Sequence, residues 1–222
     1  MADAQAVVQD WPEESREAAQ LVIDTYGEPD EVTATLLVWH DAGSWKRMVA
    51  TKWFEDHNFP APHQDSVTSV IDYRVPPEKV SDLVRFDGSV SVDRTGGEIS
   101  ARCHDEQANN LALNLAHDII TGAKSVQEAR DYYAEEFLGF RRGDPTPYME
   151  ALQFDAAQAD TTDPDERALS DEQLQEAVAQ GQQREGGESN YDPSADPDAD
   201  PDQLRDLAQR PSQAEGDDDR GP

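Results

Sequence analysis

The sequence has a single cysteine, Cys103, among 222 residues, so no disulfide can form within the chain. It also has no apolar run near the about 18–20 residues that a membrane-spanning helix requires. Residues 1–11 contain no basic residue and no apolar stretch of signal-peptide length, which argues against export. These absences favour a soluble protein of a reducing compartment, and we expect a cytoplasmic location.

Lysine is scarce as well, because only four of the 18 basic residues are lysines, whereas Asp and Glu total 48. A net charge of −30 without a basic run works against binding to nucleic acid and to anionic membranes, so we expect neither partner. The even spread of acidic residues is typical of halophilic proteins, in which molar salt shortens the Debye length to about 3 Å. An ordinary acidic protein from a mesophile with a GC-rich genome is the alternative.

The acidic charge falls on two parts of unequal length. Residues 1–154 hold 13 basic and 28 acidic residues, and residues 155–222 hold 5 and 20, so each part carries −15. The second part has one aromatic residue, Tyr191, and too few apolar residues to offset the entropy of ordering. We therefore expect a globular domain over residues 10–154 and a disordered acidic tail over residues 155–222. Two short segments of the tail, Ser170–Gln180 and Asp202–Gln209, would form helices only transiently and could fold on a protein partner.

Hydrophobic periodicity and turn residues divide the domain into helices and hairpins. We expect helices over residues 10–25, 76–86, 105–121 and 125–139, and two hairpins, 36–40 with 45–54 and 89–93 with 99–103, while residues 66–74 fit strand or helix. Asp10 is expected to cap the first helix, and Ser125 with Glu128 forms a capping box for the last. The hairpins and helices are segregated, so we predict an α+β fold, a small antiparallel sheet with packed helices on one face.

Four tracts resemble an uncharacterised family of small prokaryotic proteins, and they agree with it in order along residues 10–140. They are Tyr26–Glu31 (YGEPDE), His57–His63 (HNFPAPH), Tyr73–Lys79 (YRVPPEK), and Gly88–Val90 with Ser100–Cys103 (GSV and SARC). The resemblance does not extend to the tail. It implies no activity, since no function is assigned to that family.

A metal site is the sharpest chemical hypothesis, and its candidate ligands are His40, His57, His63, Cys103, His104 and His117. Adjacent residues of a strand point to opposite faces, so Cys103 and His104 cannot both bind one ion. Cys103 is better interpreted as a small buried hydrophobe. His117 lies away from the apolar stripe of its helix and is expected to be exposed to solvent.

His57 and His63 are the pair that decides the hypothesis. If the proline-containing loop between them is extended at about 3.1 Å per residue, their side chains stand about 19 Å apart. Convergence requires a reversal at Phe59–Pro60, with Asp56 or Asp65 as a third ligand or orienting partner. We favour the extended strap, and therefore no bound metal and no cofactor. On that interpretation, replacing both histidines by Ala changes zinc uptake and stability little, within about 0.5 kcal/mol.

No nucleophile elbow, phosphate-binding glycine loop or spaced Cys–His pair occurs in the chain. The candidate binding residues are His57, His63 and Arg102, the last as an outward-facing cation that could hold an anionic ligand. The leading hypothesis is a non-catalytic interaction or adaptor module, and the alternative is a small metal-dependent or acid–base enzyme centred on His57 and His63. Convergence of these histidines with Arg102 or an Asp in a pocket would favour the enzyme, whereas a continuous exposed apolar patch would favour the adaptor.

Overall fold

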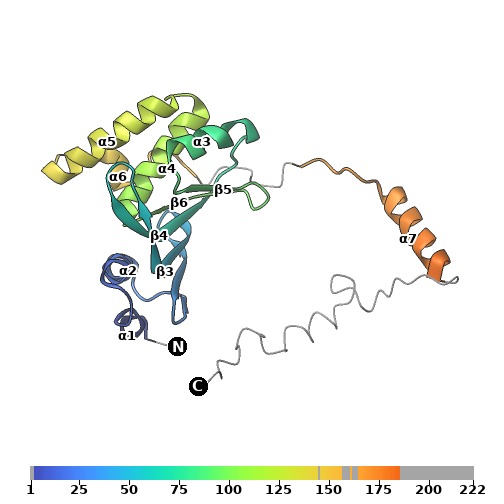
Figure 1. Ribbon diagram of the computed structural model, residues 1–222, viewed down its shortest axis with the longest axis horizontal. Coiled ribbons are helices and arrows are strands. Elements are labelled where there is room, and N and C mark those ends of the chain that lie inside the picture. Colours follow the sequence, from blue (N-terminus) through green and yellow to red (C-terminus); the bar gives the residue numbers. More distant parts are fainter. Residues whose placement is uncertain (1–2, 145, 157–160, 162–164, 186–222) are drawn as a thin grey trace, which may run out of the picture. The chain divides into compact units, whose positions relative to one another are not determined.

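The computed structural model describes residues 3–144, 146–156, 161 and 165–185. The chain divides into two compact units, residues 1–165 and residues 166–222. The first unit contains the sheet and its helices (Figure 1).

The first unit is built on an antiparallel sheet of six strands in the order β1-β2-β3-β4-β6-β5. The strands are β1 (Glu31–Val32), β2 (Leu36–Ala42), β3 (Trp45–His57), β4 (His63–Asp72), β5 (Val90–Asp93) and β6 (Glu98–Cys103). The two predicted hairpins are confirmed as β2–β3 and β5–β6, and the ambiguous segment 66–74 belongs to strand β4. The α+β class predicted from the segregation of hairpins and helices is confirmed.

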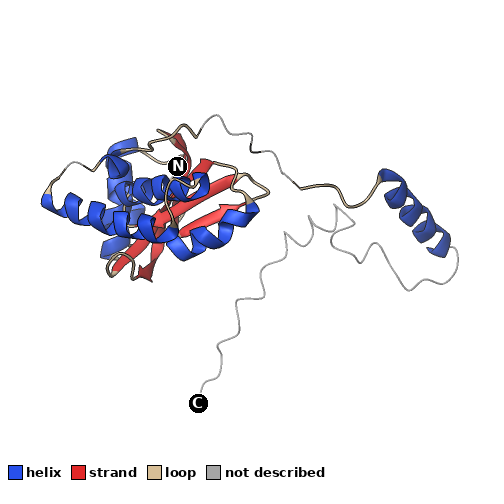
Figure 2. Cartoon of the chain, turned by 90° about the horizontal axis from the view of Figure 1, so that it is seen from above, coloured by secondary structure: helices blue, strands red, loops and turns tan. Residues whose placement is uncertain are grey.

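Figure 2 shows the helices of this unit lying over the strands. They are α1 (Ala4–Val8), α2 (Glu13–Tyr26), a short 3-10 turn η1 (Pro77–Lys79), α3 (Val80–Phe86), α4 (Glu106–Thr121), α5 (Val126–Arg142) and α6 (Pro147–Glu150). Helix α2 packs on β3 and β4, α4 packs on β4, β5 and β6, and α5 packs on α3 and α4. The helical layer therefore encloses the core against one face of the sheet.

Helix α4 is the central element of the core, because its apolar stripe is buried with the inner side chains of the sheet. A buried amide fixes its position: Asn109 Nδ2 donates to the Val67 carbonyl oxygen at 3.1 Å and to Ser69 Oγ at 2.9 Å. Helix α5 begins with the predicted capping box of Ser125 and Glu128.

The N-terminal segment differs from the sequence prediction. Helix α2 begins at Glu13, and its N-cap, Pro12, makes no side-chain capping bond, so Asp10 is not the cap. An additional helix, α1, precedes it and buries Ala4 and Val8 in the core. A helix of five residues is too short to show a hydrophobic period in the sequence.

The β3–β4 hairpin carries the feature that positions the candidate site. The pairing shifts between Ala50 and Glu55, so the long strand β3 has a bulge and changes the direction of its later side chains. Beyond the bulge the strands pair again, Glu55 with Asp65 and His57 with His63. The hairpin thus ends with two histidines directly opposite each other.

The second unit contains one described helix, α7 (Asp171–Glu185), where the sequence predicted a transient helix over residues 170–180. Its described side chains, through residue 181, are exposed. The rest of the predicted disordered tail, including the segment 202–209, lies largely outside the described residues. Among the described helices, none has the length and apolar character needed to cross a bilayer.

Candidate metal centre at the end of the hairpin

His57 and His63 converge, which contradicts the extended strap predicted from their proline-containing loop. Their ring centroids lie 4.9 Å apart. The chain reverses through residues 58–62, and the Phe59–Pro60 peptide bond is cis. The sequence alternative, a reversal at this position, is the arrangement that the protein adopts.

Contacts from distant parts of the sequence hold the reversal in place. The Phe59 ring packs against Tyr133 of α5 at 5.0 Å and against Phe86 of α3 at 6.3 Å, measured between ring centroids. The guanidinium carbon of Arg130 lies 3.8 Å from the centroid of the Phe59 ring, and this guanidinium also donates to the carbonyl oxygen of Phe86. The loop is therefore fastened to two helices.

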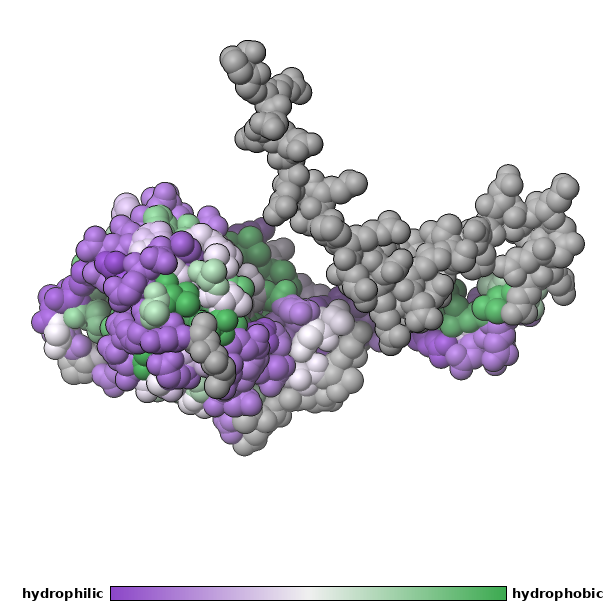
Figure 3. Space-filling view, turned by 90° about the horizontal axis from the view of Figure 1, so that it is seen from below, coloured by the Kyte–Doolittle hydropathy of each residue, from purple (hydrophilic) through white to green (hydrophobic). Residues whose placement is uncertain are grey.

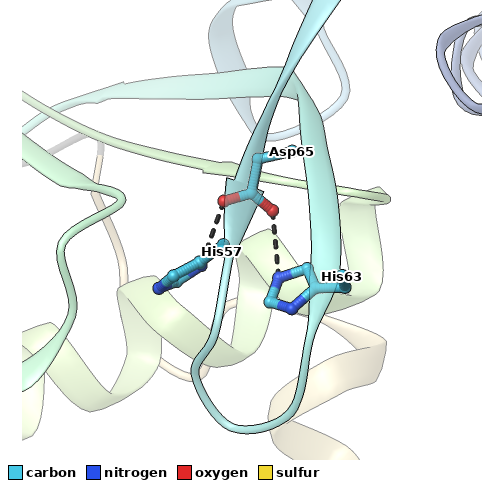
Figure 4. Close-up of side chains that lie close together, drawn as sticks. All are labelled: His57, His63 and Asp65. Atoms are coloured by element: carbon cyan, nitrogen blue, oxygen red, sulfur yellow. Dashed lines mark ion pairs between the residues drawn. The ribbon is translucent and has the colours of Figure 1, made fainter.

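The Asp65 carboxylate lies between the two imidazoles (Figure 4). Its Oδ2 is 3.0 Å from His57 Nδ1, and its Oδ1 is 3.0 Å from His63 Nε2. The side chain of Asp65 is only 2% exposed, whereas those of His57 and His63 are 18% and 23% exposed. One buried carboxylate thus faces two partly accessible imidazoles.

These contacts are close without being well-directed hydrogen bonds. Within the described part of the chain, the buried atoms His57 Nδ1 and Asp65 Oδ1 have no hydrogen-bond partner of acceptable geometry. Burying such groups without a partner is costly. The two ring nitrogens and the two carboxylate oxygens face one another across a shared space.

The tautomer of His63 shows what its contact with Asp65 requires. His63 Nδ1 lies 2.8 Å from the carbonyl oxygen of Ala61, which can only accept, so Nδ1 carries the hydrogen. In a neutral ring, Nε2 then turns a lone pair toward the carboxylate oxygen of Asp65. The contact needs either a second proton on His63 or a cation, and the neighbouring Asp65 raises the pKa of His63 accordingly.

A second buried carboxylate, that of Asp87, faces His57 from the other side. Its Oδ1 lies 3.6 Å from His57 Nε2 and accepts from the backbone nitrogen and the Oγ of Ser89 at 2.8 and 2.7 Å. Asp87 is 1% exposed. The two buried carboxylates, Asp65 and Asp87, bring two negative charges, which two imidazolium rings or one divalent cation would balance.

The ligand set suits a transition metal. One ligand atom from each of His57, His63 and Asp65 can be chosen so that the three atoms lie within 4.8 Å of one another. A tetrahedral zinc ion with bonds of about 2.0–2.2 Å holds its ligand atoms roughly 3.4 Å apart, a value between the 3.0 Å contacts and that limit. Two imidazoles and a carboxylate are a donor set that zinc and iron accept, and three protein ligands leave a position open.

The outer contacts also match those of metal-binding histidines. Such histidines commonly donate their other ring nitrogen to a carbonyl or a carboxylate, which fixes the orientation of the ring. Here Ala61 accepts from His63, and Asp87 faces His57. Sequence reasoning did not identify Asp87 as part of the site. The feature that could have drawn attention to it is the turn-forming sequence Asp87-Gly88-Ser89, directly after a helix.

The remaining sequence candidates do not join this ligand set. Arg102 pairs with Thr68, one position out of phase with Val67 and Asp65, so it lies on the opposite face of the sheet from the histidines. Cys103 is fully buried, as predicted, and burial raises the pKa of its thiol, which opposes ligation. His40 pairs with Glu31 at 2.7 Å.

His117 contradicts the expectation of solvent exposure. Its Nδ1 lies 2.8 Å from the hydroxyl of Tyr73, and its ring stacks on Phe154 with centroids 4.2 Å apart and an interplanar angle of 6°. Phe154 covers the helix face that the sequence left open, because periodicity within one helix cannot show a later segment that packs on it.

A cleft of about 540 Å³ adjoins the histidine cluster. Its walls are the loop 60–63, the start of α4, the second half of α5, and Met149 of α6. His63 is the cluster residue that lines it, together with His104 from the loop before α4. The site therefore opens onto a space of the size that small-molecule ligands occupy.

Comparison with known proteins adds no assignment: no family model, no curated protein and no solved structure matches the chain. This agrees with a resemblance to an uncharacterised family.

Proposed function

We propose that His57, His63 and Asp65 bind a divalent transition metal, zinc by ligand type, and that the protein is a small metal-dependent enzyme. The observation that supports this most strongly is the convergence of His57 Nδ1 and His63 Nε2 on the two oxygens of the buried Asp65 carboxylate, at contacts of 3.0 Å. The adjoining cleft gives a substrate access to His63.

A bound divalent cation with an open position polarises a carbonyl or phosphoryl oxygen and lowers the pKa of water, which suits hydrolysis. The chain's own residues have distinct roles in this proposal. Asp65 supplies the buried negative charge, Ala61 holds His63 with Nε2 directed at the site, and Asp87 orients His57. The proline-containing loop and the aromatic cluster around Phe59 limit the movement of both rings.

Zinc retention tests the proposal. The full chain is stripped of metal with a chelator, mixed with one equivalent of zinc and dialysed, and bound zinc is measured by elemental analysis. We expect about one zinc per parent chain and none in the His57→Ala/His63→Ala double variant, because removing two of three ligands abolishes tight binding.

The matched control is His40→Ala. Within the described residues, the ring of His40 forms an ion pair with one carboxylate, that of Glu31, and no other histidine takes part in that pair. This variant should retain zinc like the parent. Equal retention by the parent and the double variant, both folded by circular dichroism, would place any bound zinc elsewhere and refute the proposal.

A second proposed function, the interaction module, keeps one supporting observation. Helix α7 presents Leu174 and Val178, spaced four residues apart, with 44% and 60% exposure. Figure 3 shows apolar side chains beside hydrophilic ones on this helix. The test compares partners that co-purify with the parent, with Leu174→Ser/Val178→Ser, and with the polar-face control Gln175→Ser. Partners lost only from the first variant would support a role in interaction, and identical sets would contradict it.

A further inference from the structure

The cleft beside His63 has a composition of its own. Its apolar lining includes Phe137, Phe140 and Met149, of which Met149 is 2% exposed and Phe140 is 43% exposed. Its polar members are His63, His104, Asp105 and Arg141. A largely apolar pocket with a few polar groups is the usual form of a small-molecule site, because apolar walls give affinity and polar groups give orientation.

The charges around the cleft differ from those of the chain as a whole. In a protein of net charge −30, the cleft contains one carboxylate against one guanidinium and two imidazoles. That carboxylate, of Asp105, is engaged as the N-cap of α4, where Oδ1 accepts from the backbone nitrogen of Ala108 at 2.8 Å. The groups that line the cleft therefore repel an anion less than most of the surface does, and the carboxylates of Asp65 and Asp87 stay buried behind the histidines.

Arg141 is the cation that such an anion would meet. Its guanidinium carbon lies 5.1 Å from the centroid of the Phe137 ring, so the side chain lies over the apolar wall. No carboxylate of the described residues is within ion-pair distance of Arg141, whereas the adjacent Arg142 pairs with Asp144 at 2.9 Å. The guanidinium of Arg141 thus keeps its donors for a ligand, and a guanidinium fits a carboxylate in a bidentate manner.

We infer that the cleft binds a small amphipathic carboxylate, with its apolar body against Phe137 and Met149 and its carboxylate on Arg141. The group that reacts then lies at the other wall, next to His63. The inference rests on the proposed function in taking this ligand as the substrate of the metal centre, but binding to the cleft requires no metal contact.

Two probes with the same body separate charge from apolar contact. N-acetylphenylalanine carries a carboxylate, and N-acetylphenylalaninamide is its neutral counterpart. Binding to the full chain is followed by titration calorimetry and by the methyl signal of Met149 in the NMR spectrum. We expect the acid to bind about tenfold more tightly than the amide, because a charge-assisted hydrogen bond contributes more than a neutral one.

The matched variants are Arg141→Gln and Arg142→Gln, which remove neighbouring charges of the same helix, one inside the cleft and one outside it. Arg141→Gln should abolish the preference for the acid, and Arg142→Gln should leave it unchanged. Equal affinities of acid and amide for the parent, or equal losses in the two variants, would overturn the inference, as would binding that leaves the Met149 signal unshifted.

The metal proposal is judged separately. The same titration with the zinc-free chain and with the His57→Ala/His63→Ala variant reports on the cleft alone. If the acid still binds with its Arg141 dependence while no zinc is retained, the cleft assignment stands and the metal-dependent function fails. If zinc is retained but the chain binds the acid no more tightly than the amide, the metal proposal stands and the cleft assignment fails.

Discussion

Two of the histidine environments in the first unit contrast with each other. His57 and His63 face the buried carboxylates of Asp65 and Asp87. His117 instead stacks on Phe154 and contacts the hydroxyl of Tyr73, and no carboxylate of the described residues lies within ion-pair distance of its ring. The same side chain is surrounded by negative charge in one place and by aromatic rings in the other.

The two settings shift the histidine pKa in opposite directions. Asp65 raises the pKa of His63, whereas desolvation lowers the pKa of His117. In the metal-free chain, His63 therefore stabilises the fold below its ordinary pKa of about 6.5, and this contribution is lost as the pH rises through the folded-state value. The comparison teaches that a buried histidine implies a cation site only where carboxylates share its environment.

Among single substitutions, the largest expected effect is that of Asp65→Asn on zinc affinity. The substitution keeps the shape of the side chain but removes the buried charge that both imidazoles face. We expect a loss greater than the about 10–100-fold that removal of an outer-shell partner causes. Competition with a chromophoric chelator measures the affinity. His117→Gln should leave it unchanged, and an equal loss in the two variants would erase the contrast between the settings.

Asp87→Asn should have a smaller effect on the same affinity. The amide oxygen can still accept from Ser89, so the turn is preserved, but the negative charge opposite His57 Nε2 is lost. We expect zinc affinity to fall by about 10–100-fold, as for other outer-shell partners of a ligating histidine. Unaltered affinity in a variant that unfolds like the parent would remove Asp87 from the site.

The aromatic surroundings of His117 lead us to expect that the free energy of unfolding depends on pH. Because the pKa of His117 is lowered in the folded state, the unfolded chain binds more protons between that value and about 6.5. The free energy of unfolding should therefore fall as the pH drops through this window and then level off. Urea unfolding of the parent and of His117→Gln, across pH 4.5–8, gives the difference. If the unfolding free energies of the parent and the variant ran parallel across this pH range, His117 would have the same pKa in the folded and unfolded states, which would contradict the prediction.

The smallest effect is expected from deleting residues 166–222. The deleted stretch is rich in acidic residues and poor in apolar ones, so we expect the unfolding free energy of the remaining chain to change by less than about 0.5 kcal/mol. Zinc affinity should also stay the same. Thermal unfolding in matched buffer measures the first quantity, and a large drop in melting temperature would show that the second unit supports either histidine setting.

Sequence reasoning located the elements but not the meeting of the histidines. The β2–β3 and β5–β6 hairpins and the capping box at Ser125 follow from local patterns, since a turn and its flanking residues are contiguous. The reversal between His57 and His63 depends on a bulge in β3 and on contacts of Phe59 with Phe86 and Tyr133, which lie 27 and 74 positions later. Local rules applied to Pro60 and Pro62 favour an extended strap because they contain no such contacts.

Asp65 was predictable from the sequence, whereas Asp87 was not. The sequence offers Asp65 as a partner because it follows His63 by two residues, and in a strand this spacing places both side chains on one face. Asp87 comes from the end of helix α3, and only packing brings its carboxylate to His57. A site assembled from one hairpin can be anticipated in part, whereas its outer contacts from other elements cannot.

The central claim is that one divalent cation binds among His57, His63 and Asp65. Long-range nitrogen–proton NMR of the histidine rings tests it most directly, because it reports the protonation of each ring nitrogen. On adding one equivalent of zinc, we predict that His63 keeps hydrogen on Nδ1 and binds through Nε2, that His57 keeps hydrogen on Nε2 and binds through Nδ1, and that His117 is unaffected. Unchanged signals of His57 and His63, with zinc bound or not, would contradict the account.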